Sequence, residues 1–133
     1  MGTEMYGKTA ELWDDLTDVA CDFLAERARL ERPTSYTELN TVLHNRVGVK
    51  FDFEQASDRA AMGHLLGLVV ERTVGTGLML SALVHYLNAN DAGPGFYSLA
   101  QTMGLLRRGA TADERTVFWI GQLKGLYAFY RRR

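Results

Sequence analysis

The sequence predicts one α+β domain of 133 residues that is mainly helical and contains a small antiparallel sheet of two or three strands. Long amphipathic runs over 9–30 and 111–130 predict helices near both ends of the chain. The apolar run 79–87 precedes a Gly-Pro-Gly turn at 93–95 that no helix crosses, so this run predicts a strand covered on both faces. Apolar and polar residues alternate over 47–53, which predicts a partner strand with one face in solvent.

The first two helices have recognisable start and stop signals. Helix 9–30 carries its acidic residues early and its arginines late, an order that suits the helix dipole, and Pro33 prevents its continuation. The second helix is expected to begin at Ser35, because Glu38 follows at the spacing of a capping box. We expect this helix to end near residue 44 or 45.

The third helix is expected to run from Ser57, as its cap, to about Thr73. Gly63 and Gly67 lie four residues apart within it, although glycine destabilises a helix interior. We therefore expect a flat stripe here, on which the backbone of the sheet or of the last helix packs closely.

Two more helices follow the Gly-Pro-Gly turn. A short helix is expected over 96–103, ended by Gly104. The last helix begins at Thr111, where Glu114 gives a second capping-box spacing, and its terminal arginines again suit the helix dipole.

Composition limits the classes of function. With 47% hydrophobic and 23% charged residues and a formal net charge of −1, the chain is an ordinary globular protein without the basic surplus that drives non-specific nucleic-acid binding. The lone Cys21 excludes an intramolecular disulfide and a cysteine-rich zinc site. No signal-like segment and no apolar run of membrane length is present, so we expect a cytoplasmic protein without membrane contact.

The predicted order of helices, strand and turn, with Tyr-x-Glu-Leu at 36–39, is similar to a winged helix-turn-helix and resembles the DNA-binding part of alkyltransferase-like proteins. The resemblance implies a winged-helix-like core over 34–109, between an N-terminal helix (1–32) and an aromatic C-terminal helix (111–133). It also implies that the third helix enters DNA. Alkyl transfer is excluded, because the Pro-Cys-His-Arg motif is absent and Cys21 lies on the first helix.

A second resemblance covers most of the chain. The sequence looks like a group of small uncharacterised bacterial proteins that share four short patterns: Tyr-x-Glu-Leu, Met-Leu-Ser-x-Leu-Val, Pro-Gly-x-Phe and Phe-Trp. The first, second and fourth patterns stand here at 36–39, 79–84 and 118–119, and residues 94–96 read Pro-Gly-Phe, one residue shorter than the third pattern. The resemblance implies a shared fold and carries no activity with it.

The winged-helix interpretation predicts DNA contacts from two sets of basic side chains. The third helix offers Arg59, His64 and Arg72 toward the bases. A phosphate-contacting rim would come from Lys50, Arg107 and Arg108. The alternative for each of these residues is an ordinary solvated or half-buried position.

The last helix carries aromatic side chains on more than one face. Trp119, Tyr127 and Tyr130 are the residues that we expect to hold a partner chain, most simply in a two-fold dimer. Packing of a long helix on two sides within one domain explains the same pattern equally well.

Taken together, the sequence predicts a non-enzymatic binding module, a dimer that acts through DNA or protein contacts and has no catalytic residue, metal or cofactor. One alternative is a protein–protein adaptor that does not bind nucleic acid. A second alternative is a small hydrolase or nuclease using His64, Glu71 or His85. His64 and Glu71 lie seven residues apart on one face of the third predicted helix, but one histidine with one carboxylate is an incomplete metal site, and His85 lies on another predicted element.

Overall fold

Helices make up most of the structure, a computed structural model that describes residues 4–85 and 92–131. The prediction of a mainly helical fold with a small two-stranded sheet is confirmed. The elements are α1 (Ala10–Arg29), β1 (Thr34–Ser35), α2 (Tyr36–Val47), α3 (Ala56–Glu71), the 3-10 helix η1 (Leu80–Leu83), β2 (Val84–His85), α4 (Pro94–Thr102) and α5 (Ala112–Tyr130).

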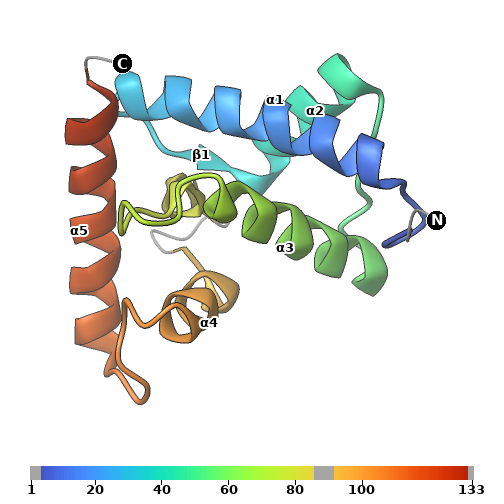
Figure 1. The fold of residues 1–133 in the computed structure, drawn as a ribbon. Coiled ribbons are helices and arrows are strands. Elements are labelled where there is room, and N and C mark those ends of the chain that lie inside the picture. Colours follow the sequence, from blue (N-terminus) through green and yellow to red (C-terminus); the bar gives the residue numbers. More distant parts are fainter. Residues whose placement is uncertain (1–3, 86–91, 132–133) are drawn as a thin grey trace.

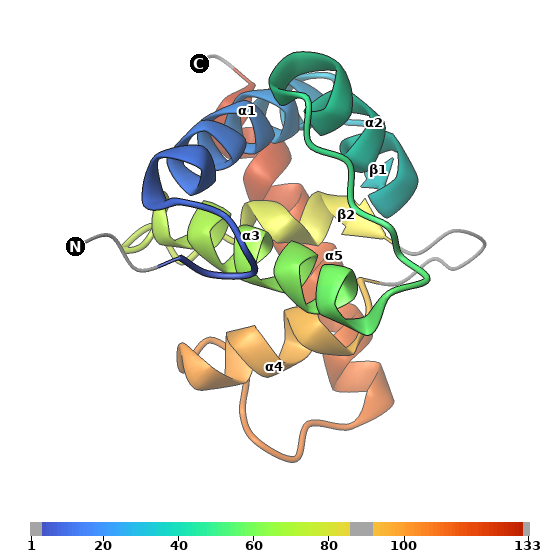
Figure 2. The same ribbon diagram turned by 90° about the vertical axis from the view of Figure 1, so that its right-hand side faces the viewer.

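The helices surround the segment that holds η1 and β2. In Figure 1, α1 and α3 lie one above the other, α5 stands across their ends, and α4 lies below α3. Figure 2 shows η1 and β2, in yellow, running through the middle of the molecule. Residues 79–84 are all buried, and η1 packs against α1, α3 and α5. The prediction that this stretch is covered on both faces is therefore correct.

The predicted antiparallel sheet is wrong. β1 and β2 pair in parallel, with Thr34 opposite Val84 and Ser35 opposite His85. Within 79–85 only Val84 and His85 form a strand, because residues 80–83 form the 3-10 helix η1. Residues 86–91, which include the end of the predicted strand, lie outside the described residues. The prediction of a turn at 93–95 is wrong in part, because Gly93 (φ 83°) is the N-cap of α4 and Pro94 and Gly95 are the first residues of that helix.

Side chains of α5 hold the segment before β2 in place of a neighbouring strand. The Oε1 atom of Gln122 accepts a hydrogen bond from the Met79 amide (2.7 Å), and its Nε2 donates to the Gly77 carbonyl (2.8 Å). The indole of Trp119 donates to the Ala82 carbonyl (2.8 Å). Since buried backbone groups need partners, these contacts allow the segment to pass through the core without a sheet ladder.

The predicted strand 47–53 is also wrong. Val47 is the last residue of α2, and Gly48 ends that helix in the left-handed conformation (φ 85°). Farther on, the side chain of Asn40 binds both backbone groups of Phe51, accepting from its amide (2.9 Å) and donating to its carbonyl (2.8 Å). The alternation reflects burial of Phe51 between more exposed neighbours, and a side-chain amide takes the role of the partner strand.

The helix caps agree with the sequence at some ends and differ at others. Thr111 and Glu114 form the complete capping box that was predicted. Ser35 accepts from the Glu38 amide as expected, but the Glu38 carboxylate accepts from the Thr34 hydroxyl. The prediction that Ser57 caps the third helix is wrong, because the helix begins at Ala56 after Gln55.

The glycines of α3 do not form the predicted packing stripe. A Cβ atom added at Gly63 or Gly67 would meet nothing within 4 Å. The close approach occurs at Gly125 of α5, where an added Cβ would lie 2.7 Å from Cδ2 of Leu78.

Gly67→Ala is therefore expected to stabilise the protein by about 1 kcal/mol, because alanine gains helix propensity in open space. Urea unfolding monitored by circular dichroism measures this change. The control Gly125→Ala has the same gain in helix propensity, but the new Cβ atom must displace the side chain of Leu78. The control should therefore stabilise the protein less, or not at all. A loss of stability in the Gly67 variant would show that α3 packs closely against another backbone after all.

Candidate functional site

A pocket lies where the start of α2, the loop before α3, the first half of α3 and the start of α4 meet. Its volume is about 390 Å³. It is lined by Tyr36, Thr37, Phe53, Arg59, Met62, Gly63 and Gly95. We call it the α2–α3–α4 pocket.

The walls of this pocket are mainly apolar. The rings of Tyr36 and Phe53 meet edge to face, with centroids 6.3 Å apart, and the Met62 side chain is buried beside them. Phe53 stands two residues after Phe51, whose backbone is fixed by Asn40. The hydrogen bonds of Asn40 therefore help to position one wall of the pocket.

Arg59 is the cationic group of the pocket. Its Nη1 donates to the Phe53 carbonyl (2.7 Å), which holds the exposed guanidinium beside the aromatic wall. Within 4–85 and 92–131, no carboxylate forms an ion pair with Arg59. A guanidinium has five N–H donors, so most of them remain for an anionic ligand.

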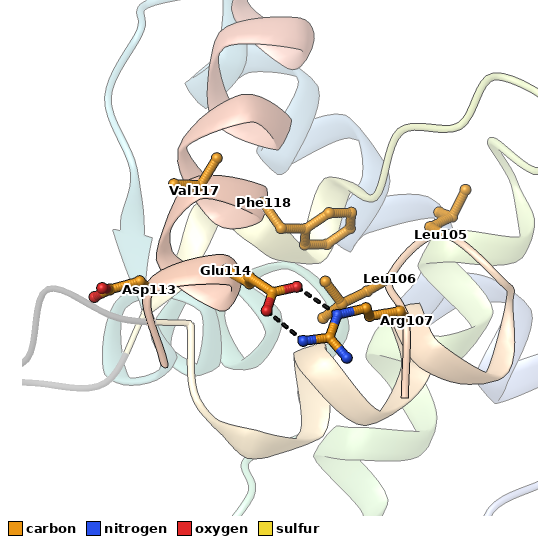
Figure 3. Close-up of a pocket in the computed structure, with 7 residues that line it drawn as sticks. All are labelled: Leu105, Leu106, Arg107, Asp113, Glu114, Val117 and Phe118. Carbon is orange, nitrogen blue, oxygen red and sulfur yellow. Dashed lines mark hydrogen bonds and ion pairs between the residues drawn. The ribbon is translucent and has the colours of Figure 1, made fainter. Parts of the chain in front are cut away.

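A second hollow lies beside the start of α5 and has a volume of about 410 Å³. Leu105, Leu106, Val117 and Phe118 form its apolar part. Figure 3 shows Arg107 directed toward Glu114, with Asp113 pointing away from this pair. Nε of Arg107 lies 2.6 Å from Oε2 of Glu114, and this contact lowers the pKa of Glu114 from 4.5 to about 2. The positive charge of Arg107 is thus already compensated.

The other predicted DNA contacts are distributed over the molecule. Arg72 lies past the end of α3 and pairs with Asp18 of α1 (2.7 Å), while Arg59 lies near the start of α3, about 20 Å away at 1.5 Å per residue. Lys50 and Arg108 are exposed in loops. The structure brings Arg59 alone of the six predicted residues into the α2–α3–α4 pocket.

His64 is half-buried, and its ring packs against those of Trp13 (centroids 4.7 Å apart) and Tyr6 (5.8 Å). Glu71 is exposed at the end of α3, and His85 lies in β2. In the described part of the chain, no three His, Cys, Asp or Glu side chains come together as metal ligands.

The predicted interface residues are partly used within the fold. Trp119 is half-buried and bonded to Ala82, and Tyr130 packs against the hydrophobic core. Burial, together with the charge of Glu31, raises the pKa of Tyr127. The most exposed large apolar side chains of α5 are instead Val117 and Ile120, at 70% and 40% exposure.

Sequence reasoning missed the pocket-lining residues other than Arg59. Tyr36 and Phe53 are visible in the sequence as aromatic residues, but their contact depends on how the loop before α3 folds. Gly95 comes from a distant part of the chain, and no spacing in the sequence indicates its position.

Comparisons with protein-family models, curated proteins and solved structures found no match. Among the helices of the described residues, none has the length and apolar character needed to cross a membrane.

Proposed function

We propose that this protein is a non-enzymatic protein-interaction module whose α2–α3–α4 pocket receives a short acidic segment of its partner. The observation that carries this proposal is the position of Arg59. Its guanidinium has no carboxylate partner among the described residues and stands beside a mainly apolar pocket.

The chemistry of the pocket defines the segment that it fits. The rings of Tyr36 and Phe53 and the thioether of Met62 suit a large apolar side chain. Arg59 suits a neighbouring Asp or Glu, because a guanidinium forms paired hydrogen bonds with a carboxylate. A volume of about 390 Å³ is in the range of known ligand pockets. The partner segment is therefore one that places an acidic residue next to a leucine, methionine or aromatic residue.

The charges on the surface favour a protein partner over DNA. Binding to the DNA backbone gains its free energy when unpaired cations replace counterions at the phosphates. Arg72 and Arg107 instead have carboxylate partners, and the whole chain has a net charge of −1. The winged-helix DNA-binding hypothesis stays a prediction that the experiment below separates from a protein-binding function.

The proposal is tested with peptides selected from a randomised heptapeptide display library on the immobilised protein. We expect the selected peptides to share an acidic residue beside a large apolar one. In calorimetry, Arg59→Gln should lower the affinity of the protein for a synthetic selected peptide about tenfold, because one charge-assisted contact is lost. Arg108→Gln removes an exposed arginine outside the pocket and should leave the affinity unchanged.

Two results would contradict the proposal. One is a set of selected peptides without acidic residues and without sensitivity to Arg59→Gln. The other is binding of a DNA duplex that weakens steeply between low and moderate salt and that needs both Arg59 and Arg108, which would favour the DNA-binding hypothesis.

A further inference from the structure

The outer face of α5 carries a stripe of four side chains. Asp113, Val117, Ile120 and Lys124 follow each other at spacings of four, three and four residues, which place them on one line along a helix with 3.6 residues per turn. The core-facing residues Gln122 and Leu126 lie on the other side of the helix. We call this set the α5 stripe.

The centre of the α5 stripe is apolar and exposed. Val117 and Ile120 are among the exposed large hydrophobic residues of the described chain. Val117 also lines the hollow together with Leu105, Leu106 and Phe118, so apolar side chains continue to one side of the stripe.

The two ends of the stripe have opposite charges. Asp113 lies one turn before Val117, and Lys124 lies one turn after Ile120. Both are exposed, and neither forms an ion pair with another described residue, although the adjacent Glu114 is paired with Arg107. Each charge is thus available to a molecule that covers the stripe.

We propose that the α5 stripe binds the same stripe of a second copy of this chain, with the two helices antiparallel. The spacing of four, three and four reads the same in both directions, so a two-fold axis near the midpoint of residues 118 and 119 aligns all four positions. Val117 then contacts the partner's Ile120, and Asp113 contacts the partner's Lys124. Each contact occurs twice in the dimer.

Self-complementarity is the reason to choose a second copy as the occupant. Opposite charges at equal distances from one midpoint match each other only across a two-fold axis between antiparallel helices. A parallel pair would instead place Asp113 against the partner's Asp113. The apolar pair at the centre has the alternating spacing of helices that pack as a coiled coil.

The proposed dimer contact and the proposed peptide site share no residue, because no residue of α5 lines the α2–α3–α4 pocket. Two pockets in one dimer would bind a partner with two acidic segments more tightly than one pocket does. The inference itself stands on α5 alone and goes beyond the proposed function.

The test is sedimentation equilibrium of the full chain and its charge variants. Asp113→Lys alone, or Lys124→Asp alone, should weaken self-association about tenfold, because two attractive contacts per dimer become repulsive. The double variant D113K/K124D should return to the wild-type dissociation constant. An equimolar mixture of the two single variants should form a heterodimer of wild-type strength.

Ile120→Ser is an independent variant that removes apolar contact without changing charge, and it should also weaken the dimer. Thermal melting checks that each variant is folded, and we expect all of them to fold because the four positions are exposed. A wild-type protein that stays monomeric at every concentration overturns the proposal. The proposal is also overturned if the single charge variants leave the dissociation constant of the dimer unchanged. The same holds if the double variant does not return to the wild-type dissociation constant.

Discussion

Gln122→Met is expected to lower the free energy of unfolding by about 3 kcal/mol, although methionine nearly matches glutamine in length and volume. The variant leaves the Met79 amide and the Gly77 carbonyl without their partners. Met79 is fully buried, so water cannot replace the lost bond at its amide. An unpaired buried donor or acceptor costs about 1–3 kcal/mol, which makes this one of the largest effects that a polar substitution can have here.

Urea unfolding measures this change, and Gln101→Met serves as the control. Gln101 also donates to a backbone carbonyl, that of Arg107 (3.2 Å), but this bond is exposed. Water can solvate the carbonyl there, so the control should change stability by less than about 0.5 kcal/mol. Equal unfolding midpoints for wild type and Gln122→Met would show that the 77–82 segment does not depend on α5.

Asn40→Leu is expected to lower the free energy of unfolding by about 2 kcal/mol and, in addition, to weaken the binding of the selected peptide. The substitution keeps the approximate shape of the side chain but removes both hydrogen bonds to the backbone of Phe51. Because Phe53 follows two residues later and forms a wall of the α2–α3–α4 pocket, we expect the pocket to lose its shape. Asn40 itself does not line the pocket, so the effect on affinity would be indirect.

Asn45→Leu on the same helix is the matched control. Asn45 is exposed, so we expect the variant protein to keep the free energy of unfolding and the affinity for the selected peptide of the wild type. Calorimetric titration of both variants, at a temperature where both are folded, separates affinity from stability. Full affinity in Asn40→Leu would mean that the pocket is held by other contacts.

The helices were predictable because their signals are local. Thr111 with Glu114 forms the complete capping box, and Gly104 ends α4 with a positive φ of 77°. Such signals depend on residues within one turn of a helix end, and distant parts of the chain do not change them. The predicted elements therefore agree with α1, α2, α3, α4 and α5 to within a few residues.

The strands were not predictable because periodicity reports burial and not hydrogen-bond partners. The alternation before α3 correctly indicates that Phe51 is buried, and the apolar run at 79–84 correctly indicates a segment covered on both faces. The partners of their backbone groups are side chains: Asn40, 11 residues from Phe51, and Gln122, 43 residues from Met79. No local pattern reveals such contacts.

The same limit applies to the candidate site. Arg59 was predicted as a contact residue from its charge and its place on a helix, but Tyr36, Phe53 and Gly95 become neighbours only through the tertiary fold. On α5, aromatic content pointed to Trp119, whereas the structure uses its indole to hold Ala82 and leaves Val117 and Ile120 exposed.

The position of the binding site is tested most directly by two-dimensional amide NMR during titration with a selected acidic peptide. The proposal predicts that the largest shift changes fall on residues that line the α2–α3–α4 pocket, namely Tyr36, Thr37, Phe53, Arg59, Met62, Gly63 and Gly95. Shift changes that are confined to α1 or to the outer face of α5, with these amides unaffected, would contradict it.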